Sequence, residues 1–252
     1  MNEFKIYEDE RIDEVNDSLS LIQKTGGLTF GTDALLLAGY VSGKYTLGAE
    51  LGGGSGIISM LLLSRDKLSA CTAYEVQASY SELIRRNAEY NSLESRLSAV
   101  CKDIRELSSS EDCDIVFTNP PYMKGDSGKT NKTDAKTIAR HEIHGDIGDF
   151  CKAAKRLLKF GGAFYAVYRP DRLTDIISAM RESCLEPKRA TFVHADTASE
   201  ASMVLIEAKR GAKSGMMLTP PLIIYADKEH RHYTKEMDYI MQNGSFPDGY
   251  KR

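Results

Sequence analysis

The pattern that most constrains the fold begins at Thr46, where short apolar runs alternate with longer amphipathic stretches. Such alternation is typical of a parallel sheet whose strands are joined by crossover helices. The apolar runs predict strands over residues 47–51, 69–75, 97–103, 114–118, 163–169, 190–195 and 201–208. The stretches between them predict helices over residues 56–64, 77–90, 146–158 and 170–183. We therefore expect an α/β fold.

The segment before Thr46 predicts two further elements. Residues 19–22 and 28–30 flank a glycine turn at 25–27 and indicate a short hairpin, and Thr32 or Asp33 then caps a helix over 34–41. No repeat and no Pro/Gly/Ser-rich linker divides the chain. We expect one domain, 1–252, with an N-terminal extension (1–45), a core (46–210) and a C-terminal extension (211–252).

Composition and charge exclude several classes of protein. At 252 residues and 42% hydrophobic content, the chain can bury a large core, yet no apolar run approaches the roughly 20 residues that span a bilayer. Its acidic start does not resemble a signal peptide, so we expect a cytoplasmic protein. With 33 Lys and Arg against 36 Asp and Glu, a nucleic acid could be bound only through a local basic patch.

The five cysteines are widely spaced and form no C-x-x-C pair. In a cytoplasmic chain this spacing favours reduced, buried thiols over disulfides or a zinc site.

The segment from Glu50 to Gly56 carries the first chemical signal. It reads Glu-Leu-Gly-Gly-Gly-Ser-Gly between a predicted strand and a predicted helix, so Gly52, Gly54 and Gly56 let a ligand approach the backbone closely. The spacing is G-x-G-x-G and not the G-x-G-x-x-G of dinucleotide sites. It suits a nucleoside with an amino-acid tail, such as S-adenosylmethionine, whose ammonium group Glu50 can meet.

The next two predicted strands also end in acidic residues. A carboxylate at Glu75 can accept both hydroxyls of a ribose, and one at Asp103 can accept from an adenine amino group. Because the carboxyl ends of parallel strands meet at one edge of a sheet, we expect these acids to lie beside the glycine turn.

Asn119-Pro120-Pro121-Tyr122 follows the predicted strand 114–118 and is the most specific motif in the chain. The two prolines fix the backbone, so the Asn119 amide oxygen and the Pro120 carbonyl can accept the two N–H groups of a planar amine. Tyr122 can stack on the ring that carries the amine. No strong general base is required, because the amine can lose its proton after transfer.

Together these motifs resemble class I S-adenosylmethionine-dependent methyltransferases that act on amino groups. Among these, the chain is similar to the bacterial valine-tRNA adenine N6-methyltransferases. The closer resemblance rests on Phe-Gly-Thr-Asp-Ala-Leu-Leu-Leu-Ala at 30–38, Ala-Arg-His-Glu at 139–142 and Pro-Pro-Leu-Ile-Ile-Tyr at 220–225. It implies a Rossmann-like fold with helices on both faces of a seven-stranded, mostly parallel sheet whose last strand is antiparallel. It also implies methylation of the adenine beside the anticodon, with S-adenosylhomocysteine as the product.

The resemblance further assigns roles to individual residues. Catalysis falls to Asn119, Pro120, Pro121 and Tyr122. The cofactor-binding residues that it implies are Phe30, Thr32, Asp33, Glu50, Gly52, Gly54, Gly56, Glu75, Val76, Asp103, Ile104 and Asn119.

Three other segments leave their interpretation open. Lys124, Lys129, Lys132 and Arg140 crowd the long connection 123–146, which is either a phosphate-contacting flap or a solvated loop. His-Glu-Ile-His at 141–144 is one residue short of a zinc H-E-x-x-H motif, so we expect no metal. The basic cluster 228–232 between Tyr225 and Tyr233 indicates either a grip on single-stranded RNA or a polar turn.

Other functions compete with tRNA adenine methylation. Asn-Pro-Pro-Tyr also serves enzymes that methylate glutamine amides of release factors, but these carry a helical domain before the glycine motif. DNA adenine methyltransferases generally add a target-recognition domain. A non-catalytic RNA-binding protein on the same fold would have no physical need for an intact Asn119–Tyr122 motif. The sequence identifies neither the tRNA nor the oligomeric state, for which a monomer or a weak dimer is expected.

Overall fold

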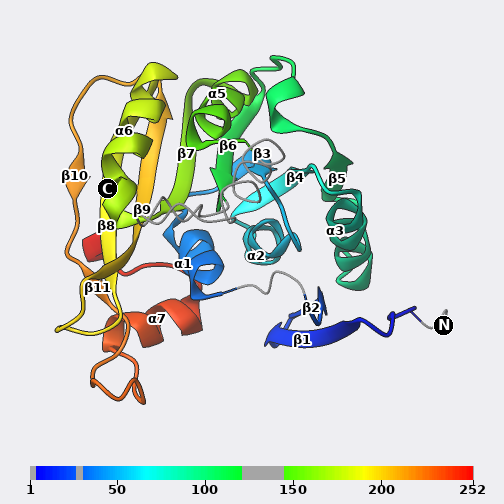
Figure 1. The fold of residues 1–252 in the computed structure, drawn as a ribbon, viewed down its shortest axis with the longest axis horizontal. Coiled ribbons are helices and arrows are strands. Elements are labelled where there is room, and N and C mark those ends of the chain that lie inside the picture. The colour runs from blue at the N-terminus through cyan, green and yellow to red at the C-terminus, as the bar shows by residue number, and fades with distance from the viewer. Residues whose placement is uncertain (1–3, 27–30, 121–144, 252) are drawn as a thin grey trace, which may run out of the picture.

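The computed structural model of the protein describes residues 4–26, 31–120 and 145–251 (Figure 1). Most of the predicted elements lie within one or two residues of their expected bounds, but β7 and β8 each begin five residues earlier than predicted, and helix α7 was not predicted. In chain order they are β1 Glu10–Asn16, β2 Leu19–Lys24, α1 Thr32–Tyr40, β3 Tyr45–Leu51, α2 Ile57–Ser64, β4 Leu68–Glu75, α3 Ala78–Tyr90, β5 Leu97–Cys101, η1 Ile104–Glu106, β6 Cys113–Thr118, α5 Ile147–Leu157, β7 Leu158–Tyr168, η2 Pro170–Arg172, α6 Leu173–Glu182, β8 Leu185–His194, β9 Ala201–Arg210, β10 Met217–Leu218, β11 Leu222–Ile223, α7 Lys235–Asn243 and η3 Asp248–Tyr250.

The main sheet has the order β10-β8-β9-β7-β6-β3-β4-β5, with β11 also paired to β8. Strands β3 to β7 are parallel, and β9 is antiparallel to both β7 and β8. The seven strands β3 to β9 confirm the expected Rossmann-like class I methyltransferase topology. The two-residue strands β10 and β11 bring the sheet to nine strands, and they are too short to leave a pattern in the sequence.

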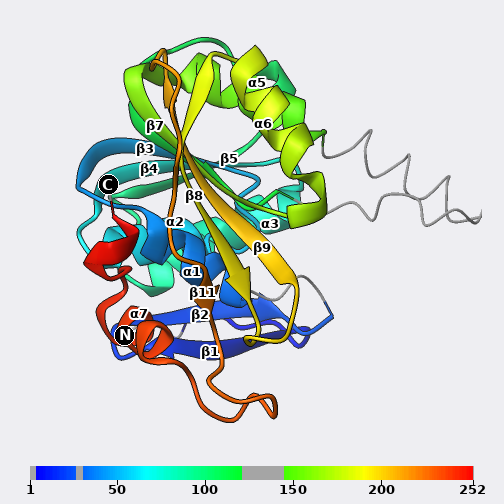
Figure 2. The same ribbon diagram turned by 90° about the vertical axis from the view of Figure 1, so that its left-hand side faces the viewer.

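Helices cover both faces of the sheet, as Figure 2 shows. Residues in β6 alternate between the faces: Ile115 and Phe117 pack into a core with α1, α2 and α3, whereas Val116 packs into a second core with α5 and α6. This alternation follows from the two-residue repeat of a strand. The predicted sandwich of sheet and helices is therefore confirmed.

The N-terminal hairpin differs from the prediction. Strand β2 pairs with the acidic segment β1, with Glu10 opposite Lys24, and the turn lies at Asn16, whose Oδ1 accepts a hydrogen bond from the Ser18 amide at 3.0 Å. The predicted partner strand 28–30 lies outside the described residues. Acidic side chains concealed β1 in the sequence, because an exposed edge strand can carry charges at most positions.

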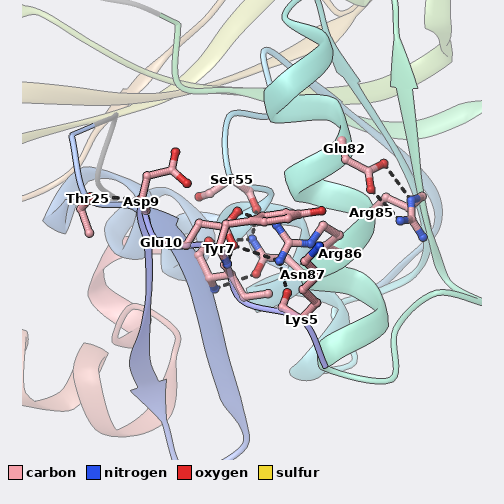
Figure 3. Close-up of polar contacts among 11 residues, drawn as sticks. Lys5, Tyr7, Asp9, Glu10, Thr25, Ser55, Glu82, Arg85, Arg86 and Asn87 are labelled. Atoms are coloured by element: carbon pink, nitrogen blue, oxygen red, sulfur yellow. Dashed lines mark hydrogen bonds and ion pairs between the residues drawn. The ribbon is translucent and has the colours of Figure 1, made fainter. Parts of the chain in front are cut away.

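Polar contacts from α3 hold the hairpin against the core (Figure 3). Asn87 is fully buried; its amide accepts from Ile22 N at 2.7 Å and donates to Ile22 O at 3.1 Å and to Ser55 O at 3.0 Å. The neighbouring Arg86 pairs with Glu10 at 2.9 Å. Helix α3 therefore links the hairpin to the loop that follows β3.

The cysteine prediction is only partly right. Cys71, Cys113 and Cys151 are buried free thiols, but Cys101 and Cys184 are exposed. Within residues 4–26, 31–120 and 145–251, no helix is both long and apolar enough to cross a membrane.

Candidate active site

Those predicted site residues that the structure describes lie at the carboxyl edge of the sheet. Strand β3 is central, with β4 on one side and β6 on the other, so the chain changes direction across the sheet at this point. Ligands of open α/β sheets bind at such a switch point. The hydroxyl of Thr118 donates to the carbonyl of Leu51 at 2.8 Å and joins the end of β6 to the start of the glycine turn.

The glycine turn has the backbone that a closely approaching ligand needs. Gly52 and Gly54 have φ angles of +72° and +55°, which disfavour any side chain. A Cβ placed on Gly54 would meet no described atom within 4 Å, so this residue faces open space. At Gly53 a side chain is disfavoured by packing, because a Cβ there would lie 2.8 Å from Ile84 of α3.

The Glu75 carboxylate closes one side of the turn. It is 5% exposed, with Oε2 accepting from the Gly54 amide at 3.0 Å and Oε1 from the Gln77 amide at 2.9 Å. The side-chain Nε2 of Gln77 also donates to Oε1, at 3.5 Å. A carboxylate has about four acceptor positions, so it can still accept from a ribose hydroxyl. The fixed acid beside an open glycine backbone fits a nucleoside cofactor.

Asp103 follows β5 and caps the short helix η1. Its Oδ1 accepts from the Arg105 amide at 2.9 Å, and the Arg105 guanidinium beside it lowers the pKa of the carboxyl. The next residue, Ile104, is buried, whereas Asp103 is partly exposed. An ionised, partly exposed acceptor at this point suits an adenine amino group.

Glu50 occupies a different position from the one expected. Its side chain is buried against α2, where the amide (3.2 Å) and the hydroxyl of Ser59 both donate to Oε2. Burial raises the pKa of Glu50 to about 8. The structure therefore places this carboxyl beneath the glycine turn, and its contact with an ammonium group stays a prediction.

Asn119 and Pro120 end β6 beside α1. Asn119 is half-buried, and its Nδ2 donates to Oδ2 of Asp33 at 2.8 Å. The N-cap of α1 is Gly31, so Thr32 and Asp33 lie within the helix and do not cap it as expected. The side chain of Asp33 turns to Asn119 because the helix begins two residues earlier than predicted.

Several predicted site residues lie outside the described ranges. They are Phe30, Pro121, Tyr122, Lys124, Lys129, Lys132 and Arg140.

Two cavities flank the end of β7. One, of about 370 Å³, is lined by residues that include Pro120, Phe150 and Tyr168. The other, of about 390 Å³, is lined by Thr32, Asp33, Tyr168, Arg169, Ser202 and Met203. Tyr168 borders both cavities and was missed in the sequence, although its position at a strand end is the signal that identified Glu75.

The C-terminal aromatic residues form a stack. The rings of Tyr225 and Tyr233 lie 5.3 Å apart, and His230 stacks on Tyr225 at 4.5 Å. His230 also contacts Asp196 in the β8–β9 connection at 3.0 Å. The segment is thus an ordered turn that carries the basic residues Lys228 and Arg231. In the part of the chain that the structure describes, no group of three His, Cys, Asp or Glu side chains is arranged to hold a metal.

Comparison with known proteins gives a consistent result. The profile of the methyltransferase small domain matches residues 25–184. The chain is 28% identical over 182 residues to the tRNA1(Val) (adenine(37)-N6)-methyltransferase of Phocaeicola vulgatus, covering 71% of this chain and 76% of that one. The protein of the same name from Dyadobacter fermentans is 23% identical over 177 residues, covering 70% and 73%.

Solved structures show the same fold. A predicted O-methyltransferase from Agrobacterium tumefaciens superposes with a TM-score of 0.69 at 23% identity, covering 85% of this chain and 98% of its own. TYW2 of M. jannaschii in complex with AdoMet superposes with a TM-score of 0.54 at 12% identity, covering 82% and 89%.

Proposed function

Because the chain belongs to the methyltransferase small domain family, we propose that it transfers the methyl group of S-adenosylmethionine to the exocyclic N6 amine of an adenine in tRNA. Residues 1–252 act as one methyltransferase domain. The observation that carries the proposal is the hydrogen bond from Thr118 to Leu51, which joins the Asn119-Pro120 segment to the glycine turn. The names of the two relatives extend it to the adenine beside the anticodon of a valine tRNA.

The residues at the carboxyl edge divide the work between two ligands. S-adenosylmethionine supplies an electrophilic methyl group on a sulfonium. Glu75 would accept hydrogen bonds from the ribose hydroxyls of the cofactor, and Asp103 would accept one from its adenine amino group. The glycine turn, which carries no side chains at Gly52 and Gly54, would let the cofactor lie close to the backbone. These groups fix the cofactor at the ends of β3, β4 and β5.

Asn119 and Pro120 bind the target amine. The amide oxygen of Asn119 and the carbonyl of Pro120 accept its two N–H groups, which turns the nitrogen lone pair toward the methyl group. The proton leaves the nitrogen after transfer. An anticodon-loop base is largely unpaired, so its extrusion into the site costs less than flipping from a duplex.

The proposal is tested with labelled S-adenosylmethionine and unmodified bulk tRNA, followed by digestion of the product to nucleosides. We expect label in N6-methyladenosine for the wild type, and a loss of about 100-fold or more for Asn119→Ala. Asn243→Ala, which alters an exposed asparagine at the end of α7, is the matched control and should keep wild-type activity.

Three other outcomes would overturn the proposal. Label on a protein glutamine or on DNA adenine, with none on tRNA, would change the substrate. Binding of tRNA and cofactor without transfer would indicate a non-catalytic RNA-binding protein.

A further inference from the structure

The carboxylate of Asp33 makes two hydrogen bonds that fix it in place. Its Oδ1 accepts from the Ala34 amide at 2.9 Å in the first turn of α1, and its Oδ2 accepts from Nδ2 of Asn119 at 2.8 Å. Both Asp33 and Asn119 are half-buried. One oxygen is therefore held by the start of the helix, and the other is directed at the residue that follows β6.

An asparagine side chain has two nearly isosteric ends, an oxygen that accepts and an NH₂ group that donates. A carboxylate can only accept, so the reversed amide of Asn119 would place two acceptor oxygens 2.8 Å apart. We propose that Asp33 is a positioning residue for methyl transfer, which holds the NH₂ end of Asn119 so that the amide oxygen is presented to the target amine. This inference rests on the proposed function.

The backbone before α1 is shaped around this carboxylate. A Cβ placed on Gly31 would lie 2.8 Å from Oδ1 of Asp33, which is closer than real side chains approach. Gly31 itself has an extended backbone that any residue could adopt. A side chain at position 31 would therefore require the Asp33 carboxylate to shift.

The surroundings of Asp33 separate it from the cofactor-binding acids. Glu75 ends β4 and Asp103 follows β5, both on the far side of β3 from β6. Asp33 instead lines the cavity of about 390 Å³ that is also bordered by Tyr168 of β7 and Met203 of β9. Asp33 thus lies on the β6 and β7 side of β3, apart from Glu75 and Asp103, so the effect of its removal should fall on turnover.

The first test compares single variants. In Asp33→Ala the NH₂ end of Asn119 loses its hydrogen bond to the carboxylate, so kcat on unmodified tRNA should fall by about 100-fold, while the Kd for S-adenosylhomocysteine stays within a few-fold of wild type. Gly31→Ala keeps the carboxylate but displaces it, and should lower kcat by about 10-fold. Asp238→Ala removes an acidic residue from the first turn of α7 and is the matched control, with no change.

The second test exchanges the two groups. Asn119→Asp alone places two carboxylates in contact and should abolish turnover. Adding Asp33→Asn restores a donor facing an acceptor, and leaves an oxygen toward the target amine. We expect Asp33→Asn/Asn119→Asp to recover at least about 10-fold in kcat over Asn119→Asp. A merely structural role for Asp33 would give no such rescue.

A third measurement needs neither tRNA nor turnover. The side-chain ¹⁵N–¹H signals of Asn119, assigned by their absence in Asn119→Ala, should shift and exchange faster with solvent in Asp33→Ala. If wild type fails to methylate tRNA while these signals respond, the proposed function fails and the pairing stands. The inference is overturned if the signals do not respond, if Asp33→Ala retains wild-type kcat, if cofactor affinity falls in parallel with kcat, or if the exchange variant gives no rescue.

Discussion

The two halves of the candidate site hold their polar groups in different ways. In the cofactor half, at the ends of β3, β4 and β5, Glu75 accepts from the Gly54 amide 21 residues earlier and from the Gln77 amide two residues later. Asp103 accepts from the Arg105 amide two residues later. In the substrate half, at the end of β6, Nδ2 of Asn119 donates to the carboxylate of Asp33, which lies 86 residues earlier in the chain.

The two halves would bind different kinds of ligand: the cofactor half binds S-adenosylmethionine, and the substrate half binds the base that is methylated. In the cofactor half, the hydrogen bonds join residues of one strand–helix–strand unit or of a single turn. The substrate half is assembled from α1, β6, β7 and β9, so its geometry depends on the packing of the whole sheet. The predictions below test how independent the two halves are.

Removal of the Asn87 side chain should have the largest effect. Asn87→Ala leaves the buried polar groups of Ile22 and Ser55 without three hydrogen bonds, so we expect the free energy of unfolding to fall by about 3 kcal/mol in urea titrations. Ser55 belongs to the glycine turn, so cofactor affinity should fall too. Arg85→Ala removes exposed ion pairs from the same helix and should cost less than about 0.5 kcal/mol. Equal losses in the two variants would refute the bracing role of Asn87.

Substitution of Glu75 should weaken cofactor binding without a matching loss of turnover, which tests whether the two halves act independently. In Glu75→Ala the ribose loses a charged acceptor, so the Kd for S-adenosylhomocysteine, measured by calorimetry, should rise about 30-fold, or about 2 kcal/mol. At saturating cofactor, kcat should remain within a few-fold of wild type. Glu106→Ala, an exposed acid nearby, should change neither constant. A fall in kcat with unchanged Kd would show that the two halves are not separable.

Glu50 should give an effect that depends on pH and is smallest near pH 5. Its pKa of about 8 lies above the ordinary value of 4.5, so between these values the folded chain keeps a proton that the unfolded chain releases. Wild-type stability should therefore decline as the pH rises from 5 to 8. Glu50→Gln carries no such proton, so its free energy of unfolding should be close to that of wild type at pH 5 and should exceed it at pH 8.

Urea unfolding at pH 5, 6.5 and 8 checks this slope, with the exposed Glu229→Gln as the control. A Glu50→Gln variant that keeps the wild-type slope would contradict the burial of a protonated carboxyl.

The comparison also explains what the sequence could predict. The strands and crossover helices of the core follow from local periodicity, and the acids that end β4 and β5 follow from their position after an apolar run. The pairing of β1 with β2 was missed because charges on an exposed edge strand hide its periodicity. The burial of Glu50 against Ser59 and the contact of Asp33 with Asn119 were missed because both depend on how helices pack on the sheet. No local pattern encodes such packing.

The place of β9 in the sheet has a consequence for synthesis. This strand is the last long one in the chain, yet it lies between β7 and β8 and pairs with both. On the ribosome, β7 therefore has no partner on that side until residue 210 has emerged, although β3 to β6 are already available to pair. At about 5–20 residues per second, an unpaired strand edge is exposed for seconds, during which chaperones or neighbouring chains can reach it. The speed at which residues 169–210 are translated sets the length of that exposure.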